Sequence, residues 1–75
     1  MRGRAYTPRV RIQLNGQPRD LERPTTVDDL VRAIGLDASP CAVEVNARLV
    51  RRAERASVTL ADGDRVEVVT LVGGG

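Results

Sequence analysis

The last five residues of the sequence, Leu71 to Gly75, are the stretch whose composition could take part in chemistry. They read Leu-Val-Gly-Gly-Gly, and the α-carboxylate of Gly75 is the reactive group. Glycines carry no side chain, so a flexible tail over residues 72–75 could enter a narrow channel in a partner protein. In this interpretation Gly73, Gly74 and Gly75 reach into the partner's active site. The alternative is a frayed end, because chain termini are commonly disordered.

The rest of the sequence predicts no catalytic apparatus. It contains no histidine, a single cysteine, and no pair of cysteines spaced for a metal or a redox motif. Cys41 is interpreted as a small residue near the start of a strand rather than as a sulfur-relay group. The pairs Asp28/Asp29 and Asp62/Asp64 suit a helix cap and a turn better than acid–base catalysis. We therefore expect no catalytic residue, no metal site and no bound cofactor.

The composition predicts one small domain. The chain has 75 residues, of which 41% are hydrophobic and 29% charged, a balance typical of globular rather than disordered chains. It has no apolar run of membrane-spanning length. Residues 1–8 contain arginines but no apolar core of a signal peptide, and they are predicted to form a flexible leader. A single cysteine cannot form an internal disulfide, which favours the cytoplasm.

The distribution of charge argues against a nucleic-acid partner. The net charge is +2, and residues 1–7 supply all of it, since ten arginines balance ten acids from residue 8 onward. Tyr6 is the only aromatic residue, so there is no platform on which bases could stack. Four arginines gather in one short stretch: Arg48, Arg51, Arg52 and Arg55. Because Glu54 lies among them, we interpret this cluster as a solvated face, with a docking patch for a protein partner as the alternative.

The first third of the chain predicts a hairpin followed by a helix. Apolar and polar residues alternate over residues 10–14, the pattern of a half-buried strand. Asn15-Gly16 predicts a tight turn, and residues 17–21 a returning strand that Pro18 restricts to a sheet edge. Thr26 and the acid three positions later form a capping-box pattern. One apolar helix face follows, closed by a glycine: Val27, Leu30, Val31, Ile34 and Gly35.

The second half predicts three more strands. They cover residues 41–45, 48–50 and 65–71, with a possible helical turn over residues 51–56. Alternation along the last strand directs Val69 and Leu71 away from the core. Together with Val72 they form a small exposed apolar surface suited to partner docking. One helix can cover only one face of one sheet, so the fold class is α+β.

Several motifs in the sequence resemble the ThiS family of sulfur carrier proteins. They are Leu14-Asn15-Gly16, Thr26 to Leu30, Val43 to Asn46, and the segment from Ala61 to Gly75. The resemblance implies a β-grasp, ubiquitin-like domain over residues 9–71. Such a domain has a single mixed sheet of four to five strands, with one helix packed across one face. The first and last strands would pair in parallel in the middle of the sheet.

The resemblance also implies a function for Gly75. In this family a ThiF-like adenylyltransferase uses ATP to adenylate the terminal carboxylate. A relay involving a cysteine desulfurase then converts it to a thiocarboxylate, and thiazole synthase takes the sulfur for thiamin biosynthesis. The chain would be a protein co-substrate rather than an enzyme, monomeric when free, with no membrane partner.

Two alternatives remain open from the sequence. The first is a related carrier, such as the small subunit of molybdopterin synthase or a carrier of another sulfur pathway. The final strand has no proline before its glycines, which favours the thiamin branch. The second alternative is a non-covalent interaction module whose tail is inert.

Overall fold

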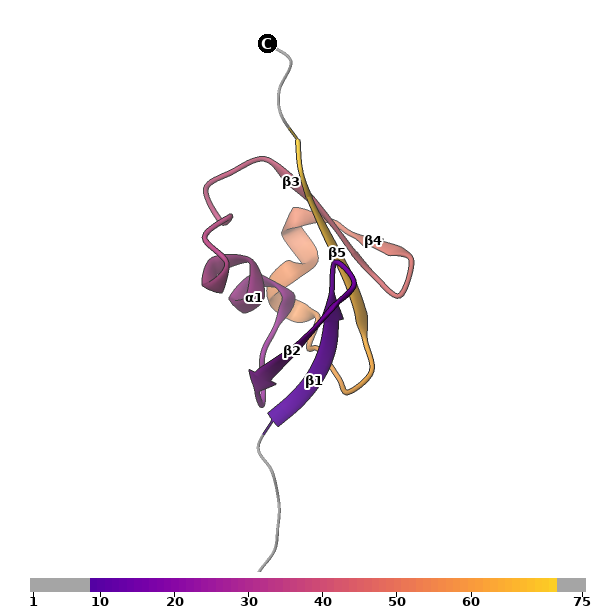
Figure 1. Ribbon diagram of the computed structural model, residues 1–75. Helices are drawn as coiled ribbons and strands as arrows, with labels where there is room; N and C mark the ends of the chain where they lie inside the picture. Colours follow the sequence, from indigo (N-terminus) through magenta and orange to yellow (C-terminus); the bar gives the residue numbers. More distant parts are fainter. Residues whose placement is uncertain (1–8, 72–75) are drawn as a thin grey trace, which may run out of the picture.

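In the computed structural model, which describes residues 9–71, five strands form one mixed sheet in the order β2-β1-β5-β3-β4 (Figure 1). The elements are β1 (Arg9–Leu14), β2 (Gln17–Glu22), α1 (Val27–Ala33), β3 (Cys41–Val45), β4 (Arg48–Val50), a 3₁₀-helix (Arg52–Ser57) and β5 (Arg65–Thr70). This arrangement confirms the predicted α+β class. The predicted leader over residues 1–8 and the predicted tail over residues 72–75 lie outside the described residues.

The first and last strands lie side by side at the centre of the sheet. β5 pairs with β1 in parallel, with Gln13 opposite Arg65 and Leu14 opposite Val66. The parallel pair requires a long crossover connection, which α1, β3 and β4 provide. The remaining pairs of strands are antiparallel. The parallel central pair expected from the family resemblance is therefore confirmed.

The hairpin between β1 and β2 forms where Asn15-Gly16 predicted it. Both residues have positive φ, 51° and 82°, the conformation that a two-residue hairpin turn requires. β2 lies at the edge of the sheet, with Pro18 opposite Gln13. An edge strand tolerates the missing proline N–H. The prediction that this strand lies at an edge of the sheet is therefore confirmed.

Local signals at both ends define α1. The Thr26 hydroxyl accepts a hydrogen bond from the Asp29 N–H at 3.0 Å, and the Asp29 carboxylate accepts one from the Thr26 N–H at 3.0 Å. At the other end Gly35 adopts a φ of 78°, which allows the Leu36 N–H to donate to the Val31 carbonyl at 3.0 Å. This is the Schellman arrangement that ends many helices. Neither helix within residues 9–71 is long and apolar enough to cross a membrane.

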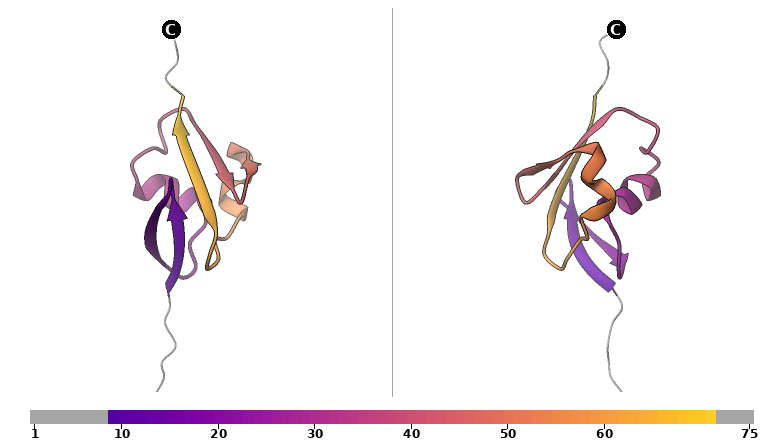
Figure 2. Two further views of the ribbon diagram at one scale, coloured as in Figure 1. Left: turned by 45° about the vertical axis from the view of Figure 1, so that its right-hand side comes forward. Right: turned by 180° about the vertical axis from the view of Figure 1, so that it is seen from behind.

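The core lies between α1 and one face of the sheet (Figure 2). Seven side chains are completely buried there: Val10, Ile12, Val27, Leu30, Val31, Val43 and Val66. They come from α1 and from β1, β3 and β5, the strands at the centre of the sheet. The opposite face of the sheet carries no helix in the described part of the chain (Figure 2). On β5, Arg65, Glu67 and Val69 are exposed.

The interpretation of the four arginines as a solvated face is wrong for Arg55. Arg55 is only 5% exposed, and its Nη2 donates a hydrogen bond to the Cys41 carbonyl at 2.8 Å. The stretch predicted as a helical turn, residues 51–56, forms the 3₁₀-helix, which packs beside α1 and turns Arg55 inward against the start of β3. Arg48, Arg51 and Arg52 are exposed, as expected.

The cap of α1 makes stability depend on pH. The pKa of Asp29 is lowered below its usual 3.8, mainly by the hydrogen bond from the Thr26 backbone N–H and further by hydrogen bonding with the Thr26 side chain. A lowered carboxyl pKa stabilises the fold above that usual value, and the stabilisation is lost as pH falls through the lower folded-state pKa. We expect Asp29→Asn to lower the midpoint of thermal unfolding at neutral pH.

Thermal unfolding followed by circular dichroism over a pH series measures this effect. The difference between the wild type and Asp29→Asn should shrink as pH falls below about 4. Asp37→Asn is the matched control, because Asp37 is exposed and makes no ion pair among the described residues. A difference for Asp29→Asn that is the same at every pH contradicts the prediction.

Candidate functional site

The candidate site is the end of the sheet at which β5 finishes (Figure 1). Thr70, the last residue of β5, pairs with Cys41, the first residue of β3. One residue later, the Leu71 N–H donates to the Pro40 carbonyl at 2.9 Å. The backbone is therefore hydrogen-bonded to its own domain as far as Leu71. The glycines predicted to enter a partner, Gly73, Gly74 and Gly75, lie outside the described residues, as does Val72.

Asn15 holds β5 from the side of β1. The Val68 N–H donates to the Asn15 Oδ1 at 2.8 Å, and the Asn15 Nδ2 donates to the Val68 carbonyl at 3.1 Å. The backbone of β1 has already turned away at this point, so the asparagine side chain continues the ladder in its place. Both main-chain groups of Val68 are thereby satisfied on this side.

Asn46 holds the beginning of β5 from the side of β3. Its Oδ1 accepts from the Arg65 N–H at 2.9 Å, and its own N–H donates to the Arg65 carbonyl at 2.7 Å. Its Nδ2 donates to Asp64 at 3.0 Å. Asn46 has a φ of 53°, so it combines a left-handed turn with a side-chain bridge. Asn15 and Asn46 each follow a strand in the sequence, but the sequence alone does not show that their side chains bridge to β5.

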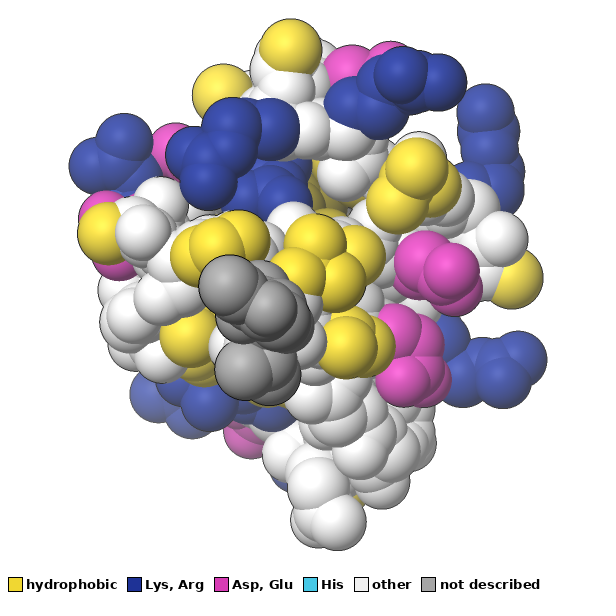
Figure 3. All heavy atoms as spheres, turned by 90° about the horizontal axis from the view of Figure 1, so that it is seen from above, with side chains coloured by type: hydrophobic (Ala, Val, Ile, Leu, Met, Phe, Trp, Pro, Cys, Tyr) yellow, Lys and Arg dark blue, Asp and Glu magenta, His cyan; other side chains and the backbone are white. Residues whose placement is uncertain are grey.

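An apolar surface lies around the end of β5. Val69 is 56% exposed and Leu71 52% exposed, so both point away from the core, as alternation indicated. Leu49 on β4 is 59% exposed and was missed by sequence reasoning, although Val50 beside it is buried. Figure 3 shows hydrophobic side chains gathered around this end of the molecule. The docking role of Val69 and Leu71 stays a prediction.

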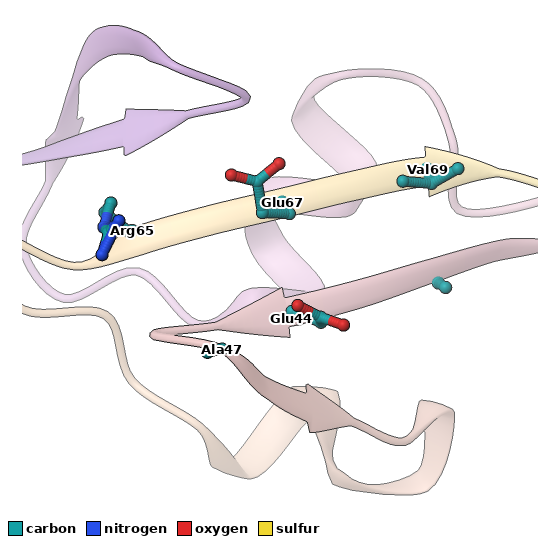
Figure 4. A pocket seen from close by; sticks show the side chains of 6 residues that line it. Glu44, Ala47, Arg65, Glu67 and Val69 are labelled. Carbon is teal, nitrogen blue, oxygen red and sulfur yellow. The ribbon is translucent and has the colours of Figure 1, made fainter.

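A shallow depression of about 370 Å³ lies on the open face between β3 and β5 (Figure 4). Glu44 and Glu67 line it and stand directly opposite each other in the strand register. Like charges in opposite positions are unfavourable for a sheet. Neither carboxylate takes part in a salt bridge among the described residues. Arg65 also lines the depression, so its three charged side chains leave a net charge of −1.

Cys41 has a structural position. It begins β3, is buried, and places its sulfur 3.9 Å from the Leu36 carbonyl oxygen. This agrees with its interpretation as a small residue near a strand start. Within residues 9–71 no three histidine, cysteine, aspartate or glutamate side chains are grouped to hold a metal ion.

Comparison with known proteins identifies the family. The sequence model of the ThiS family matches residues 12–75, most of the chain. The chain belongs to the ThiS family. A solved structure of the thiamine biosynthesis protein ThiS from Geobacter metallireducens superimposes with a TM-score of 0.74 at 29% identity, over 88% of this chain and 100% of that one. The ThiS resemblance and the β-grasp fold expected from it are thus confirmed.

Two kinds of curated protein, thiazole synthases and ycf40 proteins, are similar to this ThiS-family chain over 66 residues. Thiazole synthases of Paramagnetospirillum magneticum and Magnetococcus marinus are 35% and 38% identical over 66 residues, 88% of this chain. The chain spans only 20% of the length of each of these proteins. The uncharacterized protein ycf40 of Porphyra purpurea is 32% identical over 88% of this chain and 93% of its own length.

Proposed function

We propose that this chain is a sulfur carrier for thiazole formation in thiamin biosynthesis and that the carbonyl carbon of Gly75 carries the sulfur. The observation that carries the proposal is the ThiS family match, which continues from residue 12 through Gly75 and so includes all three final glycines. The thiamine biosynthesis protein with the same fold supports the choice of pathway.

The chemistry starts from an unreactive group. A terminal carboxyl has a pKa of about 3.3–3.7 in model peptides, so it is ionised at neutral pH and is a poor acyl donor. Attack of the carboxylate on the α-phosphorus of ATP displaces pyrophosphate and leaves an acyl adenylate. ATP is a substrate of the ThiF-like adenylyltransferase that performs this step, and the chain itself binds no cofactor.

Sulfur enters in two balanced steps. The terminal sulfur of a persulfide, supplied by the cysteine desulfurase relay, attacks the acyl carbon and displaces AMP, which gives an acyl disulfide. A second thiol then attacks the other sulfur of that disulfide. This forms a new disulfide and releases the Gly75 thiocarboxylate. The thiocarboxylate donates its sulfur in the thiazole synthase.

The folded domain binds these enzymes and so brings the carbonyl carbon of Gly75 to their active sites. Glycines lack Cβ atoms, so they can pass through a narrow entrance into a water-poor pocket of the partner. The apolar surface of Val69 and Leu71 provides docking area beside that entrance. A thiazole synthase as final acceptor is supported by the two thiazole synthases that contain a stretch similar to this chain. Joining two partners in one polypeptide raises their effective concentration.

Intact mass spectrometry tests the proposal. The chain is purified from cells in which the thiamin pathway is induced, and a fraction should show one oxygen replaced by sulfur at Gly75. Cells without the adenylyltransferase are the control and should yield only the carboxylate. Purified thiocarboxylate should then supply sulfur to thiazole synthase. An unmodified terminus in induced cells contradicts the carrier function, and sulfur accepted only by molybdopterin synthase contradicts the choice of pathway.

A further inference from the structure

A second hollow, which we call the basic groove, lies beside the end of β5 and differs from the depression between Glu44 and Glu67. It measures about 410 Å³. Its walls include apolar residues from three segments and three arginines from the 3₁₀-helix and its N-cap: Pro40, Leu49, Leu71, Arg51, Arg52 and Arg55. Leu71 is the last described residue, so whatever fills this groove lies at the point where the described chain ends.

Arg55 has an unmet hydrogen-bonding requirement in this groove. The residue is only 5% exposed, and its Nη2 donates a hydrogen bond to the Cys41 carbonyl at 2.8 Å. The buried Nε has no hydrogen-bond partner among the described residues. A buried polar group without a partner is unfavourable, and the guanidinium cannot escape by losing its proton. The described residues therefore lack an acceptor that Arg55 requires.

The groove also lacks a counter-charge. None of Arg51, Arg52 and Arg55 forms a salt bridge within residues 9–71. The nearby Glu54 is occupied, since its carboxylate accepts a hydrogen bond from the Arg51 backbone N–H at 3.0 Å. Figure 3 shows Arg side chains along one border of the apolar surface and acidic side chains along another. The surface therefore favours a partner with the opposite arrangement of charge.

We propose that the basic groove binds a segment of the adenylating partner in which an aspartate or glutamate stands beside an apolar side chain. The carboxylate accepts hydrogen bonds from the arginines, and the apolar side chain covers Leu49 and Leu71. This inference rests on the proposed function, which requires such a partner to grip the domain close to Gly75. Arginine is well suited to the role because its planar fork matches a carboxylate in geometry.

A protein segment fits the groove better than other anions. A small inorganic anion would satisfy the arginines but leave Leu49 and Leu71 exposed to water. A nucleic acid would bring its phosphates close to Glu44 and Glu67 on the adjoining face, which repel them. An acidic side chain next to an apolar one satisfies both parts of the groove at once.

Binding measurements on exposed residues of the groove test the inference without disturbing the core. The probe is the purified ThiF-like adenylyltransferase from the same genome, titrated with the full chain in a calorimeter. We expect Arg52→Glu and Leu49→Asp each to raise the dissociation constant about tenfold or more, the size of a contact that matters at an interface. Arg19→Glu is the matched control, because it makes the same change of charge on β2 at the opposite edge of the sheet.

The Arg55 side chain provides a second readout. Its Nε–H gives an NMR signal of its own, which should shift when the adenylyltransferase is added. Inorganic phosphate alone, at the same ionic strength, should leave it in place. Arg55→Lys keeps the positive charge but loses the planar guanidinium, so the folded variant should bind the adenylyltransferase more weakly. If Arg55→Lys does not fold, Arg52→Glu and Leu49→Asp still test the inference, because both residues are exposed.

The outcomes separate this inference from the proposed function. Weaker binding by Arg52→Glu and Leu49→Asp, with unchanged binding by Arg19→Glu, supports the groove. Any of four results overturns it: all three variants weaken binding equally, none of them affects binding, the wild type does not bind, or phosphate alone shifts the Arg55 signal. A chain without Gly75 should still bind through the groove. If it also still supports pyrophosphate release, the carrier function fails while the groove stands.

Discussion

Deletion of Gly75 is expected to abolish pyrophosphate release by the adenylyltransferase. The deletion withdraws the terminal carboxylate by one residue, about 3.3–3.6 Å of extended chain. Reacting atoms must approach to about 3–3.5 Å, and a misplacement of about 1 Å can already cost about 100-fold in rate, so we expect a loss of at least that size. A pyrophosphate assay with ATP and the purified adenylyltransferase measures it.

Two further variants show whether reach is the cause. Gly75→Ala keeps the length and adds one Cβ, so any loss it causes reports the width of the partner's channel. An extra glycine after Gly75 displaces the carboxylate in the opposite direction and should also lower the rate. All of these changes leave residues 9–71 intact, so the free energy of unfolding should be unchanged. Undiminished pyrophosphate release after the deletion would exclude Gly75 as the activated group.

Asn15→Ala is expected to lower the free energy of unfolding by about 3–4 kcal/mol. Loss of the side chain removes the acceptor of the Val68 N–H and the donor to the Val68 carbonyl, each worth about 1 kcal/mol net. Alanine at a positive φ adds roughly 1–2 kcal/mol, because its Cβ crowds the backbone in the left-handed region. Urea unfolding at equilibrium measures the total.

Asn15→Gly separates the two contributions. Glycine accepts the positive φ without strain, so this variant should lose only the hydrogen bonds, about 2 kcal/mol. Hydrogen exchange at the Val68 amide should accelerate in both variants, since the amide loses its acceptor. If Asn15→Gly is as stable as the wild type, the bridge from Asn15 to β5 does not contribute to stability.

Local signals made most of the fold predictable. Thr26, Asp29 and Gly35 define the ends of α1 through bonds that span only three to five positions. Asn15-Gly16 likewise specifies its hairpin through the φ angles of two adjacent residues. Such interactions depend on residue types at short separations, which the sequence shows directly. The parallel pairing of β1 and β5 is not local, and only the family resemblance supplied it.

The features that were missed depend on distant partners. Arg55 is buried because the 3₁₀-helix returns to the beginning of β3, where the Cys41 carbonyl accepts its hydrogen bond. Asn15 bridges to Val68, which is 53 positions away. At the candidate site, alternation correctly directed Val69 and Leu71 outward, but it could not show that Leu49 from another strand joins them. Their docking role and that of the final glycines remain predictions.

The parallel pairing of β1 and β5 also has a practical consequence for handling the protein. β1 begins with Arg9 and β5 ends with Thr70, and Figure 1 shows the start of β1 and the end of β5 at opposite ends of the sheet. The register places them about nine residues of strand apart, roughly 30 Å at 3.3 Å per residue. A fluorophore, an affinity handle or a solid support tethered ahead of Arg9 is therefore remote from the end that partners must reach. The protein can be immobilised by that side while the proposed partner enzymes are tested on the other.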